Sequence, residues 1–231
     1  MKTVKTLLLI LALAIFLTLS GCTGSTIPNE KHENFRILNS TMNYQNQALY
    51  SGYLQEIILF ENDITIEKIT KEFHQRKISD ELVYKLDLKH EFLNQLTEDE
   101  RTTVVETTEY YTQNKRYYFE DGVWNIETKD FQSDGLVKIT FIEEHFLSSL
   151  NFKKVGTLVT FTGTIRQDSI GAFFNQTIAS DIKNVQMEIN YDSAIRQLFY
   201  FNFTYQTTTD RIVKVNTTIL YNEHDFVLPI V

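Results

Sequence analysis

The sequence predicts an α+β protein built around one antiparallel β-sheet with two helices. Three observations support this fold class. Several segments after residue 35 alternate apolar and polar side chains with a period of two, as strands with one buried face do. Short turn signals join these segments, and Asp121-Gly122 is the clearest of them. Two stretches, Leu136–Leu150 and Asp168–Ala179, instead space their apolar residues three or four apart, which favours amphipathic helices.

The first residues are predicted to be a targeting signal rather than part of the fold. Lys2 and Lys5 precede an unbroken apolar run from Leu7 to Leu17. This run is much shorter than the ~20 residues that cross a bilayer as a helix, but it is typical of a signal peptide. The following motif, Leu19–Cys22 (LSGC), resembles the bacterial lipobox, in which a peptidase cuts before the cysteine and its sulfur receives a diacylglycerol. The alternative is an ordinary signal peptide with a chance cysteine.

The lipobox sets the expected domain organisation and location. Residues 1–21 are expected to form the signal peptide, residues 22–34 a lipidated tether of small and polar residues, and residues 35–231 one domain. Cys22 would carry diacylglycerol and a further acyl chain such as palmitate, and no other cofactor is expected. These acyl chains would hold the protein at the cell membrane, facing outside the cytoplasm. Loss of Lys2 and Lys5 would change the formal charge from −8 to −10.

The N-terminal half of the domain is predicted to be all strand. Its strands are rich in Thr, Tyr, Phe and Val, which suit a pleated surface that is buried on one side. In the third strand, for example, Leu82, Tyr84, Leu86 and Leu88 share one face. The predicted strands are Tyr53–Phe60, Ile64–Phe73, Leu82–Lys89, Thr102–Thr112, Lys115–Glu120 and Val123–Ile126.

The C-terminal half is predicted to contain both helices and a three-stranded meander. A strand at Val155–Ile165 separates the helix at Leu136–Leu150 from the helix at Asp168–Ala179. Strict alternation then predicts strands at Asn184–Tyr191, Ile195–Tyr205 and Val213–Tyr221. Short turns near Asp192-Ser193 and at Thr208–Arg211 connect these three strands.

Composition and motifs argue against several function classes. One cysteine excludes an intramolecular disulfide and a zinc site built from several cysteines, and a net charge of −8 argues against nucleic acid as a partner. The segment His90–Asn94 is one residue short of the H-E-x-x-H zinc motif, because Asn94 stands where the second histidine is needed. Nucleophile-elbow, P-loop and Rossmann glycine patterns are absent from the sequence. The protein is therefore expected not to be an enzyme, and no catalytic or metal-binding residue is predicted.

The order of these features resembles one family of bacterial lipoproteins. A lipobox and short tether precede many antiparallel strands, and the Tyr-rich segment Arg116–Trp124 contains the Asp-Gly turn. A helix, the strand Gly156–Ile165, a short helix and a meander ending at Val227–Pro229 follow. This order is similar to that of the LolA-like superfamily, which includes the periplasmic lipoprotein carrier and the mycobacterial glycolipid-carrier lipoproteins. The resemblance implies a curved antiparallel half-barrel with helices across its concave face, where an apolar space can hold acyl chains.

The sequence is compatible with two functions. The first is binding or carriage of a hydrophobic ligand, a lipid or acyl chain, between the sheet and the helices. The second is a structural or protein-interaction lipoprotein with a solid core and an envelope protein as partner. The many Thr, Asn and Gln residues depart from the lipid carriers and argue against a large cavity. Tyr and Thr residues on the outer strand parity, such as Tyr200 and Thr204, support the second function. The residues expected to line the pocket are Ile142, Phe146, Ile170, Phe173, Phe174, Ile178, Phe199, Phe201 and Phe203.

Overall fold

The computed structural model describes residues 27–46, 52–78, 81–93, 103–129, 141–174, 180–221 and 225–230 of the chain. The predicted signal peptide and Cys22 lie outside the described residues. Contacts divide the chain into two units, residues 1–36 and residues 37–231. The described part of the first unit is the beginning of helix α2 (Ile27–Asn46), where Arg36 and Glu33 form an exposed ion pair. The second unit contains the rest of α2 and the whole β-sheet.

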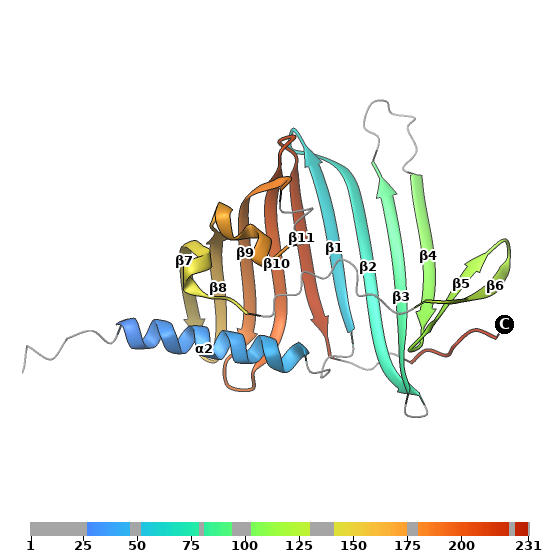
Figure 1. Cartoon of the computed structure of the whole chain (residues 1–231), viewed down its shortest axis with the longest axis horizontal. Helices are drawn as coiled ribbons and strands as arrows, with labels where there is room; N and C mark the ends of the chain where they lie inside the picture. The colour runs from blue at the N-terminus through green and yellow to red at the C-terminus, as the bar shows by residue number, and fades with distance from the viewer. Residues whose placement is uncertain are drawn as a thin grey trace, which may run out of the picture. The chain divides into compact units, whose positions relative to one another are not determined.

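Eleven antiparallel strands form a single open sheet in the second unit. The strand order is β6-β5-β4-β3-β2-β1-β11-β10-β9-β8-β7, so the sheet consists of two meanders that meet where β1 pairs with β11 (Figure 1). This open, curved sheet fits the half-barrel expected from the resemblance. The strands are β1 (Gly52–Glu61), β2 (Ile64–Ile78), β3 (Glu81–Phe92), β4 (Thr103–Tyr111), β5 (Lys115–Glu120), β6 (Val123–Thr128), β7 (Leu147–Val155), β8 (Leu158–Ile165), β9 (Ile182–Asp192), β10 (Gln197–Thr207) and β11 (Ile212–Leu220).

The structure confirms the predicted strands and the hairpin at Asp121-Gly122. Asp121 and Gly122 both have positive φ, 53° and 82°, as a two-residue hairpin turn of this kind requires. The ends of the predicted strands lie within about three residues of the observed ends, except that β2 continues to Ile78, beyond the predicted end at Phe73. Period-two alternation succeeded here because burial of one sheet face imposes that period on the sequence.

The predicted helix at Leu136–Leu150 is wrong in the part that the structure describes. Glu144–Phe146 form only a short 3-10 turn, η2, and β7 begins at Leu147. The stretch pairs with β8 through a hairpin at Gly156, where φ is 63°. Pairing with β8 makes this stretch part of the sheet, and this tertiary context overrides the local helical spacing.

The second predicted helix is shorter than expected, and part of the predicted tether is helical. Within Asp168–Ala179, the described residues form a shorter 3-10 helix, η3 (Gln167–Ala172), and residues 175–179 lie outside the described ranges. The tether at residues 22–34 was expected to be irregular, but α2 begins at Ile27 within it. Pro28 and Glu30 suit the first turn of a helix, the first because of its fixed φ and the second because of its charge. Neither signal was used in the prediction.

The strands from β7 to β11 carry the buried core on one face. In β9, Val185, Met187, Ile189 and Tyr191 are almost fully buried, while the residues between them are not. Within the second unit, Leu38, Thr41 and Met42 of α2 and Ile170 of η3 are buried as well. We call the side of the sheet that carries these strand residues the core face and the opposite side the outer face.

Asn39 fixes the second half of α2 to the segment before β7. Its side-chain amide donates to the carbonyl oxygen of Ile142 at 2.8 Å, and its side-chain oxygen accepts from the Ile142 amide, also at 2.8 Å. Asn39 is 6% exposed and Ile142 is fully buried. A buried polar side chain is therefore matched to two main-chain groups that would otherwise lack partners.

We expect Asn39→Ala to destabilise the protein clearly, because it leaves a buried N–H and a buried C=O without hydrogen bonds. Each such loss costs about 1–3 kcal/mol, and the melting temperature should fall by several degrees. Ser40→Ala is the matched control. The Ser40 hydroxyl only donates back to the carbonyl of Ile37 within the helix, so its loss should change the melting temperature little. Equal melting temperatures for the two variants would contradict the role assigned to Asn39.

Candidate functional site

The structure brings most of the expected pocket residues together, but it packs them as core. Ile142, Ile170, Phe173, Phe201 and Phe203 are each no more than 8% exposed. Phe146, Phe174 and Phe199 are half-buried, and Ile178 lies outside the described residues. The prediction thus found the apolar layer over β9 and β10, and the described side chains in it are largely shielded from solvent.

Ring contacts show how this layer is filled. Phe146 meets Phe173 edge to face, with ring centroids 5.5 Å apart. Phe174 meets Phe203 at 5.5 Å and Tyr205 at 5.8 Å in the same manner. Such edge-to-face pairs stabilise an aromatic core beyond the area that they bury. The described side chains therefore interdigitate here, as they do in a packed interior.

The core face continues past this packed layer onto the other meander. One register row runs across the strands through Met187, Phe203, Val215, Ile57, Ile69, His90 and Val105. Burial falls along it: Phe203 is 1% and Val215 5% exposed, Ile57 and Ile69 are half-buried, and Val105 is 47% exposed. This face thus passes from a sealed core to a partly open surface, in which the ion pair of His90 and Glu67 lies among the apolar side chains.

Neighbouring residues widen this open surface. Leu59 of β1 and Leu86 and Leu88 of β3 are half-buried on the same face, and Phe92 is 43% exposed at the end of β3. On the outer face, the same strands carry several ion pairs, among them Lys68–Glu56 and Lys89–Glu91. We call the residues Ile57, Leu59, Ile69, Leu86, Leu88, Phe92 and Val105 the open apolar patch.

Sequence reasoning missed the open apolar patch as a candidate site. The alternation in Leu82–Lys89 was recognised, but it cannot distinguish a face covered by helices from one left partly open. That difference depends on which strands the helical segments pack against. The available signal is the position of the helical segments along the chain. η2 comes directly before β7 and η3 directly after β8.

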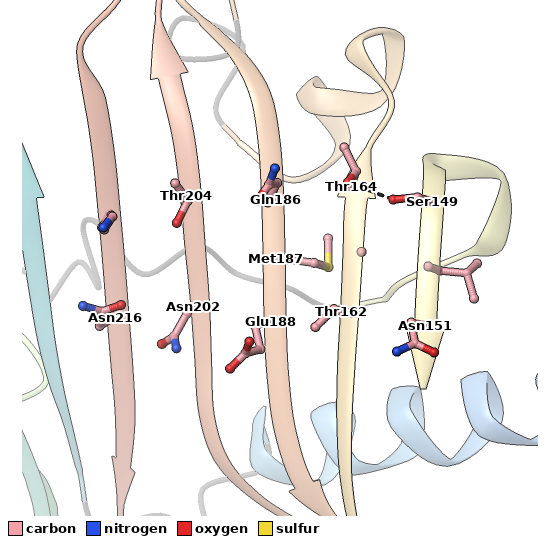
Figure 2. Close-up of a pocket in the computed structure, with 13 residues that line it drawn as sticks. Ser149, Asn151, Thr162, Thr164, Gln186, Met187, Glu188, Asn202, Thr204 and Asn216 are labelled. Atoms are coloured by element: carbon pink, nitrogen blue, oxygen red, sulfur yellow. Dashed lines mark hydrogen bonds between the residues drawn. The ribbon is translucent and has the colours of Figure 1, made fainter. Parts of the chain in front are cut away.

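The outer face of β7 to β11 carries a second candidate site, a polar groove of about 520 Å³. Figure 2 shows its side chains in two rows across five strands. One row runs through Asn151, Thr162, Glu188, Asn202 and Asn216, and the other through Ser149, Thr164, Gln186, Thr204 and Lys214. Leu150, Gly163 and Met187 complete its lining. None of the residues predicted to line a pocket lies in this groove.

A charged cluster holds the strands beside the open apolar patch. The guanidinium of Arg116 on β5 donates to the carboxylates of Glu109 on β4 and, at 2.7 Å, Glu127 on β6, and the Tyr111 hydroxyl donates to Glu109. Burial raises the pKa of Glu109, but the hydrogen bonds from Arg116 and Tyr111 outweigh it and lower the pKa below the ordinary value of 4.5. Glu109 is therefore ionised at neutral pH, and the cluster links β4, β5 and β6.

Two of the histidines that the structure describes lie in ion pairs outside this cluster. Among the described residues, no group of three or more His, Cys, Asp and Glu side chains could hold a metal ion. His90 is paired with Glu67 at 2.5 Å and His145 with Glu143 at 2.7 Å. His224 lies outside the described ranges. Of the helices that the structure describes, none combines the length and apolar character needed to cross a membrane.

Comparison with known proteins finds a likeness among solved structures. No family model matches the sequence, and no curated protein matches it. Among solved structures, the chain is similar to the crystal structure of LprF from Mycobacterium bovis, with a TM-score of 0.47 and 10% sequence identity. The alignment covers 85% of this chain and 96% of that chain. Nothing about function follows from a likeness at this level.

The cluster around Glu109 predicts a pH-dependent contribution to stability. The folded pKa of Glu109 lies below its unfolded value, so its contribution is present above about pH 4.5 and is lost as the pH falls through the folded pKa. Glu109→Gln should therefore lower the melting temperature near pH 7 and have a smaller effect near pH 3. Glu120→Gln, at an exposed glutamate on β5, should have little effect at either pH. A Glu109→Gln deficit that is constant with pH would contradict the proposed role.

Proposed function

We propose that this protein is a lipid-anchored, extracytoplasmic lipoprotein that binds a hydrophobic ligand, a lipid or acyl chain, on the open apolar patch. The role proposed is binding or carriage, with no catalysed reaction. The anchor proposed is diacylglycerol and acyl chains on Cys22, in accordance with the lipobox motif.

One observation carries the ligand proposal: the fall in burial along the row from Phe203 to Val105. A contiguous apolar surface exposed beside a core is costly in water and commonly marks a binding site. Phe92 and Val105 stay exposed, while Ile57 and Ile69 on the same face are half-buried, with His90 between Ile69 and Val105. An acyl chain laid along this row would cover apolar side chains of β1, β2 and β4 and would pass over His90 of β3. Its end would meet the sealed core at Val215.

The position of the patch differs from the pocket predicted from the sequence. The predicted pocket was between the sheet and the helices, where Phe174 now packs against Phe203 and Tyr205. The open apolar patch lies on the same face but on the other meander. A ligand there needs no rearrangement of the packed aromatic layer.

The second candidate function is a structural or protein-interaction lipoprotein that carries no ligand. The aromatic packing of Phe146, Phe173, Phe174 and Phe203 favours it, since a sealed interior is what a purely structural domain needs. In that case the open apolar patch would be an interface for an envelope protein. Ligand binding is preferred because the patch is continuous with the core along one register row.

Ligand binding is tested with the exposed residues of the patch. The full chain with Cys22→Ser is purified, and its affinity for a pyrene-labelled fatty acid is measured by fluorescence. The double variant Phe92→Gln/Val105→Gln should bind about tenfold more weakly, because losing ~60 Å² of apolar contact costs about 1.5 kcal/mol. Mass spectrometry of an organic extract should show lipid in the parent protein and less of it in the variant.

The matched control is Val155→Gln/Leu158→Gln, which changes two exposed apolar residues at the β7–β8 hairpin, 66% and 45% exposed. This control should bind the fatty acid like the parent. If the parent neither binds the probe nor carries lipid, the hydrophobic-ligand proposal fails and the structural function is preferred. Equal losses in both double variants would place the binding elsewhere.

The anchor is tested separately. The wild-type chain expressed in a bacterium should incorporate labelled palmitate and sediment with membranes. Cys22→Ser should lose the label and appear in the soluble extracytoplasmic fraction, because the thiol is the group that is alkylated. Labelling of the Cys22→Ser variant would show that the anchor is not on this residue.

A further inference from the structure

The two meanders differ sharply in the chemistry of their outer faces. On β1 to β4, the outer face is charged and paired, with Lys68–Glu56 at 2.7 Å, Lys85–Asp87 at 2.6 Å and Lys89–Glu91 at 3.2 Å. This is the ordinary pattern of a solvated sheet face. On β7 to β11, the groove is lined instead by hydroxyl and carboxamide side chains. It contains one acid, Glu188, and one base, Lys214, so it carries no net charge.

The groove is arranged to make many hydrogen bonds at regular intervals. Each row places one polar side chain on each of five neighbouring strands, and strands are spaced ~4.8 Å apart, so a row extends about 19 Å. Figure 2 shows the carboxamides of Asn151, Asn202 and Asn216 in the same row. The volume of the groove, about 520 Å³, is within the range of small-molecule sites, roughly 300–1,000 Å³.

Much of this hydrogen-bonding capacity is unused within the described part of the chain. Ser149 donates to Thr164 at 2.9 Å, and the Asn202 oxygen accepts from the Thr217 amide at 3.3 Å. The side-chain amides of Asn151, Gln186 and Asn216 make no hydrogen bond with another described residue. Each of these amides offers two donors and one acceptor oxygen.

Glu188 is held as a fixed acceptor at the centre of the groove. The hydroxyl of Tyr200, on the neighbouring strand, donates to it at 2.7 Å. Burial and this hydrogen bond raise the pKa of Tyr200 to about 12, so the phenol remains a donor at neutral pH. The carboxylate keeps its remaining lone pairs for a further donor.

We propose that this outer-face groove binds an uncharged saccharide chain. Sugar hydroxyls donate and accept at once, and side chains that do both, such as carboxamides and hydroxyls, match them. A linear saccharide presents such groups at repeated intervals, as the two rows do. The absence of net charge in the groove favours a neutral ligand over an anionic or cationic one, although the whole chain carries −8.

This inference is independent of the proposed lipid site. Gln186 and Glu188 flank the buried Met187 on β9, so they point to the side opposite the core. The open apolar patch is on the core face of the other meander. Variants of the groove should therefore leave fatty-acid binding unchanged, and the two proposals can fail separately.

The test is isothermal titration calorimetry of the full chain with Cys22→Ser against three neutral linear sugars: cellotetraose, maltotetraose and the tetramer of β-linked N-acetylglucosamine. At least one should bind with a dissociation constant in the millimolar range or tighter. Asn151→Ala/Gln186→Ala, at two exposed positions, should weaken that binding at least tenfold. Because no net charge is involved, the affinity should change little between low and high salt.

The matched control is Gln113→Ala/Asn114→Ala, which removes one exposed Gln and one exposed Asn at the β4–β5 turn. It should bind the sugar like the parent. Thr162→Arg, which places a bulky cation in the groove, is a second variant and should also abolish binding. Far-ultraviolet circular dichroism and melting curves check that all variants fold. No binding of any of the three sugars, or equal binding by parent and groove variants, would overturn the proposal.

Discussion

The pairing of β1 with β11 is the interaction on which the rest of this structure depends. It runs from Gly52 opposite Leu220 to Phe60 opposite Ile212 and joins the first and last strands of the chain at the middle of the sheet. Each meander alone would have one more unpaired edge, and such edges favour aggregation. Gln55 and Thr217, both fully buried, lie opposite each other on these two strands and are hydrogen-bonded at 3.2 Å. A polar contact inside an apolar face helps to fix the register there.

The two meanders share one sheet, so each face of the sheet extends over both of them. The burial and the chemistry of the side chains on each face differ between the two meanders. The core face is sealed at Phe203 and Val215 and partly open at Ile69 and Val105. The outer face carries paired charges on β1 to β4 and a polar groove without net charge on β7 to β11. The same alternation of side chains therefore produces two candidate sites on opposite faces.

Strand positions could be predicted from the sequence because alternation reflects a local fact, the burial of every second residue. The segment Leu147–Val155 shows where such reasoning ends. Its leucines at 147 and 150 also suit a helical spacing, and only pairing with β8 decides that it is a strand. Helix α2 was missed because its buried face includes Asn39 and Thr41, whose polarity hides the apolar stripe. Asn39 is buried at low cost only because Ile142, far along the chain, supplies its two partners.

The sequence by itself determined the strands, the turn at Asp121-Gly122 and the aromatic residues that form the core. These depend on side-chain period and on turn conformations that few residues adopt. The tertiary structure decided which apolar residues are sealed and which stay open, because that depends on strand order and on where the helical segments pack. It also decided that Gln186 and Glu188 share a groove with Asn151 and Asn216. Residues from five strands meet there because of the strand register, which cannot be read from their spacing in the sequence.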